Sequence, residues 1–190
     1  MSEKQAAQLT VVMLGNCKGE PHLFHQECIQ GHYDALGATH YKCVLCQVTY
    51  GVRTGEMPRG TIRWYKDDHM MLQGFDKSTC PFVIIIEYHF PSGTLANGTN
   101  YSGTRRTAFL PGNMEGIECL GLLIVAFERK LPFLVGTSIT TGQSNTVVWS
   151  GIHHKTNPSG GTSHFGWPDE TYFARVKGEL SDRGVTEADI

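Results

Sequence analysis

The sequence feature that most constrains this fold is a group of cysteine and histidine side chains near the start of the chain. The last two form a Cys-x-x-Cys pair, and in order the members are Cys17, His22, His25, Cys28, Cys43 and Cys46. Thiolates and imidazoles are the ligands of structural zinc sites, which use four of them for each ion. In a reducing compartment this spacing favours a metal over disulfides, so we expect a small zinc-stabilised fold here.

Composition limits the other choices. The chain has 190 residues, with 16 Lys and Arg against 18 Asp and Glu, and a net charge of -2. General nucleic-acid binding needs a basic surplus, which this chain lacks. The longest apolar run, CPFVIIIEYHF, is far shorter than the roughly 20 residues of a membrane-spanning helix, and no segment looks like a signal peptide. We expect a soluble protein of the cytoplasm or nucleus, with Cys80 and Cys119 as inert core residues.

A stretch rich in glycine and holding one proline, TYGVRTGEMPRG at 49–60, predicts a connector. We therefore expect a first domain at 1–50, a linker at 51–60 and a second domain at 61–190. In the first domain, LTVVML at 9–14 predicts a strand, and IQGHYDALGA at 29–38 predicts a short helix.

The second domain combines strand and helix patterns. Runs rich in β-branched and aromatic residues predict strands at 60–66, 82–90, 132–138 and 145–149. Between them, 91–106 and 157–163 read as loops. An amphipathic helix is expected at 111–130, with Ile117, Leu120, Ile124 and Phe127 on its buried face, and another at 168–184, with Asp169 as N-cap and Gly184 as the C′ stop. The predicted fold class is α+β, with a bent antiparallel sheet and two main helices.

The cysteine and histidine order of the first domain resembles the RING finger, in its version with two histidines. The resemblance implies that Cys17, His22, Cys43 and Cys46 hold one zinc ion. It assigns His25 and Cys28 to a second site, whose other ligands would be a Cys-x-x-Cys pair upstream of Cys17. Residues 1–16 hold neither cysteine nor histidine. We expect about one zinc per chain and a shortened finger; either the protein lacks the first ligand pair or the sequence begins inside the finger.

Three stretches of the second domain stand out together: SGTRRTAFLPGN at 102–113, LVGTSITTGQSNTVVWSGIHHKT at 134–156 and FGWPDETYFARVKGEL at 165–180. They resemble the carboxy-terminal domain of the Deltex family of ubiquitin ligases, over about 130 residues from near Tyr50 to the last residue. In that family a RING finger directly precedes this domain, and the two are joined by a segment similar to YGVRTGEMPRG.

The resemblance implies an enzyme. The RING finger recruits a ubiquitin-conjugating enzyme charged with ubiquitin, and the second domain binds ADP-ribose or NAD in a groove. Ubiquitin is then joined to a ribose hydroxyl of ADP-ribose, either free or on an ADP-ribosylated macromolecule. By position in the family motifs, His153 and Glu179 are the catalytic residues. Two alternatives remain open: a binding module for ADP-ribose or NAD with weak or no ligase activity, and a zinc-stabilised interaction protein.

The loop GTSITTG is the expected phosphate contact. Backbone N–H groups freed by the glycines can face a pyrophosphate, and hydroxyl groups add donors, although such loops are often ordinary turns. Family members usually carry a second serine where this chain has Ile139. The candidate binding residues in this loop are Gly136, Thr137, Ser138, Ile139, Thr140, Thr141 and Gly142.

The sequence context of the two catalytic candidates also suggests roles for them, apart from the resemblance. His153 follows a buried strand, where an imidazole with an ordinary pKa near 6.5 suits proton transfer at neutral pH, or serves as a hydrogen-bonded structural group. His154 would point the other way. Glu179 lies seven residues after Tyr172, near the apolar line of the last helix. A carboxylate there orients His153, accepts a ribose proton, or pairs with a neighbouring arginine.

Three more residues complete the expected groove. The family motif around HFGWPD usually carries histidine or tyrosine where this chain has Phe165, whose ring can still stack on an adenine or ribose face. Trp167 is either pocket wall or core. Arg106 matches a family arginine near the ligand and meets either phosphate or solvent.

Overall fold

The computed structural model describes residues 10–190 apart from positions 16, 18, 37–39 and 140, so Thr140, Leu9 of the expected strand and 37–38 of the expected helix lie outside the described residues. The chain divides into two compact units, Met1–Arg53 and Thr54–Ile190. This division falls inside the segment 49–60 that the glycine pattern marks as a connector. In the described part of the chain, no helix is both long enough and apolar enough to cross a membrane.

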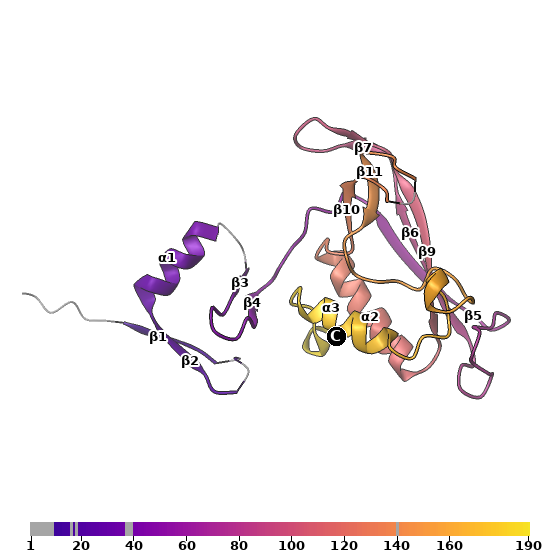
Figure 1. Ribbon diagram of the computed structural model, residues 1–190, viewed down its shortest axis with the longest axis horizontal. Helices are drawn as coiled ribbons and strands as arrows, with labels where there is room; N and C mark the ends of the chain where they lie inside the picture. Colours follow the sequence, from indigo (N-terminus) through magenta and orange to yellow (C-terminus); the bar gives the residue numbers. More distant parts are fainter. Residues whose placement is uncertain (1–9, 16, 18, 37–39, 140) are drawn as a thin grey trace, which may run out of the picture. The chain divides into compact units, whose positions relative to one another are not determined.

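The first unit consists of two short hairpins and a helix (Figure 1). Its elements are β1 (Val11–Leu14), β2 (His22–His25), α1 (Gln26–Leu36), β3 (His40–Lys42) and β4 (Thr49–Gly51). Strands β1 and β2 pair antiparallel, as do β3 and β4. The buried core is small and includes two of the clustered cysteines: Leu14, Cys17, Ile29 and Cys43. Such a core is too small to stabilise a unit of this size strongly by itself.

A three-stranded antiparallel sheet forms the frame of the second unit. Its order is β5-β6-β9, with bounds β5 (Thr61–Asp67), β6 (Val83–Phe90) and β9 (Thr104–Pro111). Towards the end of β6, exposure alternates: Glu87 and His89 are exposed, whereas Tyr88 and Phe90 are buried. Successive side chains of a strand point to opposite faces, so the sheet has a core face and an outer face in this region.

Two helices, α2 (Met114–Glu128) and α3 (Tyr172–Ser181), lie side by side on the same side of this sheet (Figure 1). Their apolar residues join those of the sheet in one hydrophobic core. The Asn113 side chain accepts a hydrogen bond from the N–H of Gly116 at 2.9 Å and so caps the start of α2. The architecture agrees with the predicted mixture of an antiparallel sheet and two main helices in this unit.

Shorter elements complete the unit. β7 (Gly93–Thr94) pairs with β8 (Asn100–Tyr101), and β10 (Phe133–Gly136) pairs with β11 (Thr146–Trp149). Two 3-10 turns follow, η1 (Thr162–His164) and η2 (Glu187–Asp189). The prediction of a loop at 91–106 was wrong in part, because β7, β8 and the first residues of β9 lie there. Two-residue strands carry too few side chains to leave a periodic pattern.

Two details of the predicted helices were wrong. Ile117, expected on the buried face of α2, is 50% exposed, whereas Cys119 and Leu123 are fully buried. Nearly every side of α2 is apolar, so its hydrophobic period does not define one face. The N-cap position of α3 belongs to Thr171, not Asp169. Gly184 has a φ of 75°, but it stands two residues beyond the C-cap Asp182 and not at C′.

Candidate functional site

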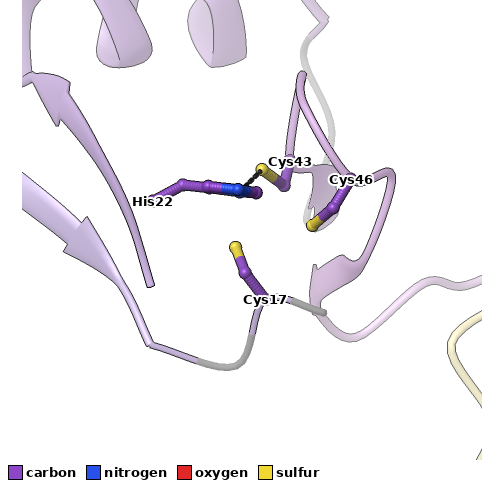
Figure 2. Close-up of side chains that lie close together, drawn as sticks. All are labelled: Cys17, His22, Cys43 and Cys46. Atoms are coloured by element: carbon purple, nitrogen blue, oxygen red, sulfur yellow. Dashed lines mark hydrogen bonds between the residues drawn. The ribbon is translucent and has the colours of Figure 1, made fainter. Parts of the chain in front are cut away.

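Four of the expected zinc ligands converge in the first unit (Figure 2). Cys17 comes from the segment between β1 and β2, His22 begins β2, and the turn between β3 and β4 supplies Cys43 and Cys46. Their four potential ligand atoms all lie within 4.8 Å of one another. The Nδ1 atom of His22 is 3.2 Å from the Sγ atom of Cys43.

This set fits a zinc ion. Three sulfurs and one imidazole nitrogen are a common ligand set of structural zinc sites. In a tetrahedral site two sulfurs lie about 3.8 Å apart, as follows from Zn–S bonds of about 2.3 Å, so the four atoms need only small shifts to close around an ion. Cys17 and Cys43 are buried, as expected of a closed structural site. The cluster thereby joins Cys17 and His22, which precede α1 in the sequence, to the two cysteines that follow it.

An aromatic stack supports the cluster. The hydroxyl of Tyr50 lies 3.2 Å from the Sγ atom of Cys17. Its ring stacks on Tyr41 at a centroid distance of 5.4 Å, and Tyr41 stacks on Tyr33 at 3.7 Å. A hydroxyl that donates to a thiolate orients the ligand and stabilises its charge. The Tyr50 contact was not foreseen, and its only sequence signal is an aromatic residue four positions after Cys46.

His25 and Cys28 do not join this cluster among the residues that the structure describes. His25 ends β2 and Cys28 lies in the first turns of α1, and both are exposed. The structure thus separates the four ligands assigned to one zinc from the two assigned to another.

In the second unit, His153 and Glu179 lie in direct contact. One carboxylate oxygen of Glu179 is 2.5 Å from Nδ1 of His153, and the other accepts the backbone N–H of His153 at 2.8 Å. The two residues are 26 positions apart; His153 lies four residues after β11, and Glu179 projects from α3. The imidazole is 54% exposed and the carboxylate 18%. A carboxylate on Nδ1–H fixes the tautomer that leaves Nε2 as a proton acceptor.

Buried neighbours hold this pair in place. The hydroxyl of Tyr172, also on α3, donates to the carbonyl of His153 at 3.1 Å. His154 points the other way into the core, where Nε2 lies 2.9 Å from the Tyr88 hydroxyl and Nδ1 lies 2.9 Å from the Ile152 carbonyl. Burial lowers the pKa of His154 to about 4, so this ring stays neutral at pH 7. His154 is therefore structural, while His153 is accessible.

A buried ion pair ties the following segment to the same helix. Lys155 Nζ contacts the carboxylate of Asp169 at 2.6 Å, and the side chains are only 3% and 1% exposed. Arg175 of α3 reaches the same carboxylate at 2.9 Å. Burial alone would raise the pKa of Asp169, but hydrogen bonds from the two cations and the Thr171 hydroxyl outweigh it and hold that pKa well below its usual value. Neither Lys155 nor this role of Asp169 was predicted, because Lys155 stands in the polar stretch SGIHHKTNPS, where a lysine gives no sign of burial.

The loop at 136–142 satisfies several of its own amides. The N–H of Ser138 donates to the Gln143 carbonyl and that of Gly142 to the Ser138 carbonyl, each at 2.8 Å. The N–H groups of Ser138 and Gly142 are therefore occupied within the loop, and the contact of this loop with phosphate stays a prediction. Ile139 is fully exposed at the tip, and Thr137 places its hydroxyl 3.3 Å from that of Ser144. Among described residues, no hydrogen bond joins this loop to His153.

The other groove candidates differ in accessibility. Phe165 is 61% exposed, and its φ of 54° is unusual for a bulky residue. Trp167, for which both wall and core were open, lies in the core at 1% exposure and donates its indole N–H to the Phe109 carbonyl at 3.0 Å. Arg106 is half-buried and donates to the Arg105 carbonyl at 3.2 Å.

Comparison with known proteins decides the family. The model of the Deltex C-terminal domain matches residues 54–185. The chain belongs to the Deltex family. Among similar Deltex proteins, the probable E3 ubiquitin-protein ligase DTX3 of Homo sapiens is 38% identical over 172 residues, which is 87% of this chain and 48% of that protein. The E3 ubiquitin-protein ligase DTX1 of Homo sapiens is 37% identical over 183 residues, or 92% of this chain and 28% of that protein.

A third Deltex relative, the E3 ubiquitin-protein ligase DTX4 of Mus musculus, is 34% identical over 174 residues, or 87% of this chain and 28% of that protein. The chain therefore spans about half the length of the DTX3 relatives and less of the others. The match to the Deltex domain includes both members of the His153–Glu179 pair and excludes the zinc cluster.

Proposed function

We propose that this chain acts as a RING-type ubiquitin ligase that transfers ubiquitin to a ribose hydroxyl of ADP-ribose or NAD, free or on an ADP-ribosylated macromolecule. The observation that carries the proposal is the bidentate contact between Glu179 and His153 inside a Deltex domain. Support for the ubiquitin step comes from relatives that are named E3 ubiquitin-protein ligases. The partners are a ubiquitin-conjugating enzyme, ubiquitin and the nucleotide.

The first unit contributes the docking platform. Cys17, His22, Cys43 and Cys46 would hold one zinc ion, which supplies fixed geometry and no reaction chemistry. By joining the segments before and after α1, the ligands set the shape of the surface that meets the conjugating enzyme. The resemblance assigns His25 and Cys28 to the second site of the finger, and with about one zinc per chain these two residues would hold no ion of their own.

The second unit contributes proton transfer. Glu179 holds Nδ1 of His153, and Nε2 removes the proton from a ribose hydroxyl as its oxygen attacks the thioester carbonyl carbon of ubiquitin. An ester bond forms, the carbon–sulfur bond breaks, and the thiolate of the conjugating enzyme leaves. Glu179 also stabilises the imidazolium that forms. We assign exposed Phe165 to stacking on the nucleotide, and Arg106 and the hydroxyl groups of the 136–142 loop to its polar contacts.

The decisive experiment measures transfer with charged conjugating enzyme, ubiquitin and NAD. His153→Ala should lower the transfer rate on the order of 10²-fold or more, the usual contribution of a general base. Zinc content should stay unchanged, because His153 lies outside the metal cluster. Equal product from wild type and variant would exclude His153 as the base.

Calorimetry with ADP-ribose separates the alternatives. Binding without transfer by the wild type would support the alternative of a nucleotide-binding module with weak or no ligase activity. No detectable binding would contradict both nucleotide-dependent functions and leave a zinc-stabilised interaction protein.

A further inference from the structure

The second unit carries a cavity whose lining does not include the two residues proposed for proton transfer. It has a volume of about 340 Å³ and lies on the sheet formed by β5, β6 and β9. Neither His153 nor Glu179 lines it. A cavity of this size is at the small end of the range for ligand sites, which is about 300–1,000 Å³.

Strand register explains how the cavity is built. Thr61, His89 and Arg105 are partners across the three strands and form one row. Two residues further along, Arg63, Glu87 and Thr107 form the next row on the same face. All six residues are exposed, while the intervening Tyr88 is buried on the core face. The cavity therefore lies on the outer face, away from α2 and α3.

The charge of this cavity is opposite to that of the whole chain. Two arginines of the outer face line it, Arg63 and Arg105, against the single carboxylate of Glu87, although the chain has a net charge of -2. Arg106 also borders the cavity, but it is in the row of Tyr88, whose side chains point to the other face. The Tyr65 hydroxyl donates to Glu87 at 3.4 Å. In the part of the chain that the structure describes, no ion pair links the guanidinium groups of Arg63 and Arg105 to a carboxylate. The local surplus is available to an anionic ligand.

The donors favour a phosphoryl group. Arginine forks and threonine hydroxyls approach from the two outer strands, β5 and β9, which suits a tetrahedral dianion better than a planar carboxylate. Recognition of a nucleobase needs an aromatic face for stacking. Tyr88 of the lining is 1% exposed and offers no such face, so the small imidazole of His89 is the one exposed ring among the lining residues. The lining therefore favours a phosphoryl group without a base.

We propose that this cavity binds a phosphorylated side chain of a partner protein, at a site separate from His153 and Glu179. Arg63 and Arg105 hold the phosphoryl oxygens, and Thr61 and Thr107 add hydroxyl donors. Glu87 limits the affinity, because its carboxylate repels the ligand. A phosphorylated partner would thereby dock on the outer face of the sheet.

Binding of a labelled phosphoserine peptide to the full chain tests the proposal, with the unphosphorylated peptide measured in parallel. The Arg63→Gln/Arg105→Gln double variant should weaken binding by about tenfold or more, from the loss of charge-assisted hydrogen bonds. Glu87→Gln should strengthen binding severalfold, an effect that loss of folding would not produce. Lys66→Gln is the matched control, because Lys66 lies on β5 but in a row of the opposite face, against Ile84. Both Lys66→Gln and His153→Ala should bind as the wild type does.

Several outcomes would overturn the proposal. One is equal binding of the two peptides, and another is a Lys66→Gln variant as weak as the double variant. Failure of the phosphopeptide to bind at millimolar concentration would also refute it. Adenosine monophosphate is the competing probe: if it binds more tightly than the peptide and loses affinity in the double variant, the cavity is a nucleotide site instead.

Discussion

At the scale of single residues, the main finding is the difference between two adjacent histidines. His153 presents an accessible ring whose Nδ1 is held by Glu179, while His154 is enclosed by the core and bonded to Tyr88. The same side chain thus serves as a candidate base at one position and as a structural group at the next. Alternation of direction along an extended chain separates the two roles.

Glu179→Gln tests the orienting contact. The amide keeps the shape of the side chain but loses the charge that favours the Nδ1–H tautomer and stabilises the imidazolium. We expect the turnover rate to fall on the order of 10²-fold, with little change in the KM for NAD. Glu118→Gln is the control, since Glu118 forms a half-exposed ion pair with Lys177 and has no proposed part in the transfer reaction. A variant that changes only KM would show that Glu179 binds nucleotide instead of orienting His153.

The low pKa of His154 predicts a dependence of stability on pH. The folded pKa is about 4 and the unfolded value is 6.5, so between these values the unfolded chain binds a proton that the folded chain does not. The contribution of neutral His154 to the free energy of unfolding is fully present above pH 6.5. It decreases as pH falls towards 4, by about 3 kcal/mol in total. Urea denaturation at a series of pH values measures this. His154→Gln should be less stable at pH 7 and should show a smaller decrease; an equal decrease would contradict the assignment.

At the scale of elements, the long strands and helices were predictable because their patterns extend over many residues. In β6, residues 83–86 form a continuous β-branched run, and residues 87–90 alternate between exposed and buried side chains. The apolar residues of α2 indicated a helix. The buried face of α2 could not be predicted, since α2 is apolar on nearly all sides. The sequence suggested a role for His153 and for Glu179 separately, but their contact crosses 26 positions and depends on tertiary structure, so it was the resemblance that linked the two. The pairing of Lys155 with Asp169 left no periodic signal.

The segment between β11 and α3 depends on that pair. Lys155→Met should lower the free energy of unfolding by about 3–5 kcal/mol, because it leaves the Asp169 carboxylate buried with less compensation. Arg175→Met removes the other cation, whose side chain is 40% exposed, and should cost about 1 kcal/mol or less. Chemical denaturation compares the two variants. Equal losses would indicate that Lys155 has no special structural role.

At the scale of the whole molecule, the two units differ in how they are stabilised. The second has an extensive hydrophobic core, whereas the first has four buried apolar or cysteine residues and a metal-ligand cluster. Ligand spacing predicted a metal site here, and the resemblance to the RING finger selected the four residues that form the cluster. The aromatic support of the cluster could not be predicted, because the stack joins residues from α1, β3 and β4.

Removal of metal should therefore unfold one unit and spare the other. We expect a chelator to abolish amide-exchange protection in 10–53 while residues 61–190 keep theirs, since zinc binding supplies folding energy to small domains. Cys43→Ser should reproduce the effect, and Cys28→Ser should not, because Cys28 is exposed and outside the cluster. Protection that survives chelation in both units would show that the first unit folds without zinc.

The aromatic residues are divided between the units in a useful way. All three tryptophans, at 64, 149 and 167, belong to the second unit, while the first unit carries Phe24 and the stacked tyrosines 33, 41 and 50. Indole fluorescence therefore reports on the second unit alone, because the first unit has no tryptophan. The unmodified protein thus contains an optical probe that follows unfolding of the Deltex domain without a contribution from the zinc-ligand unit.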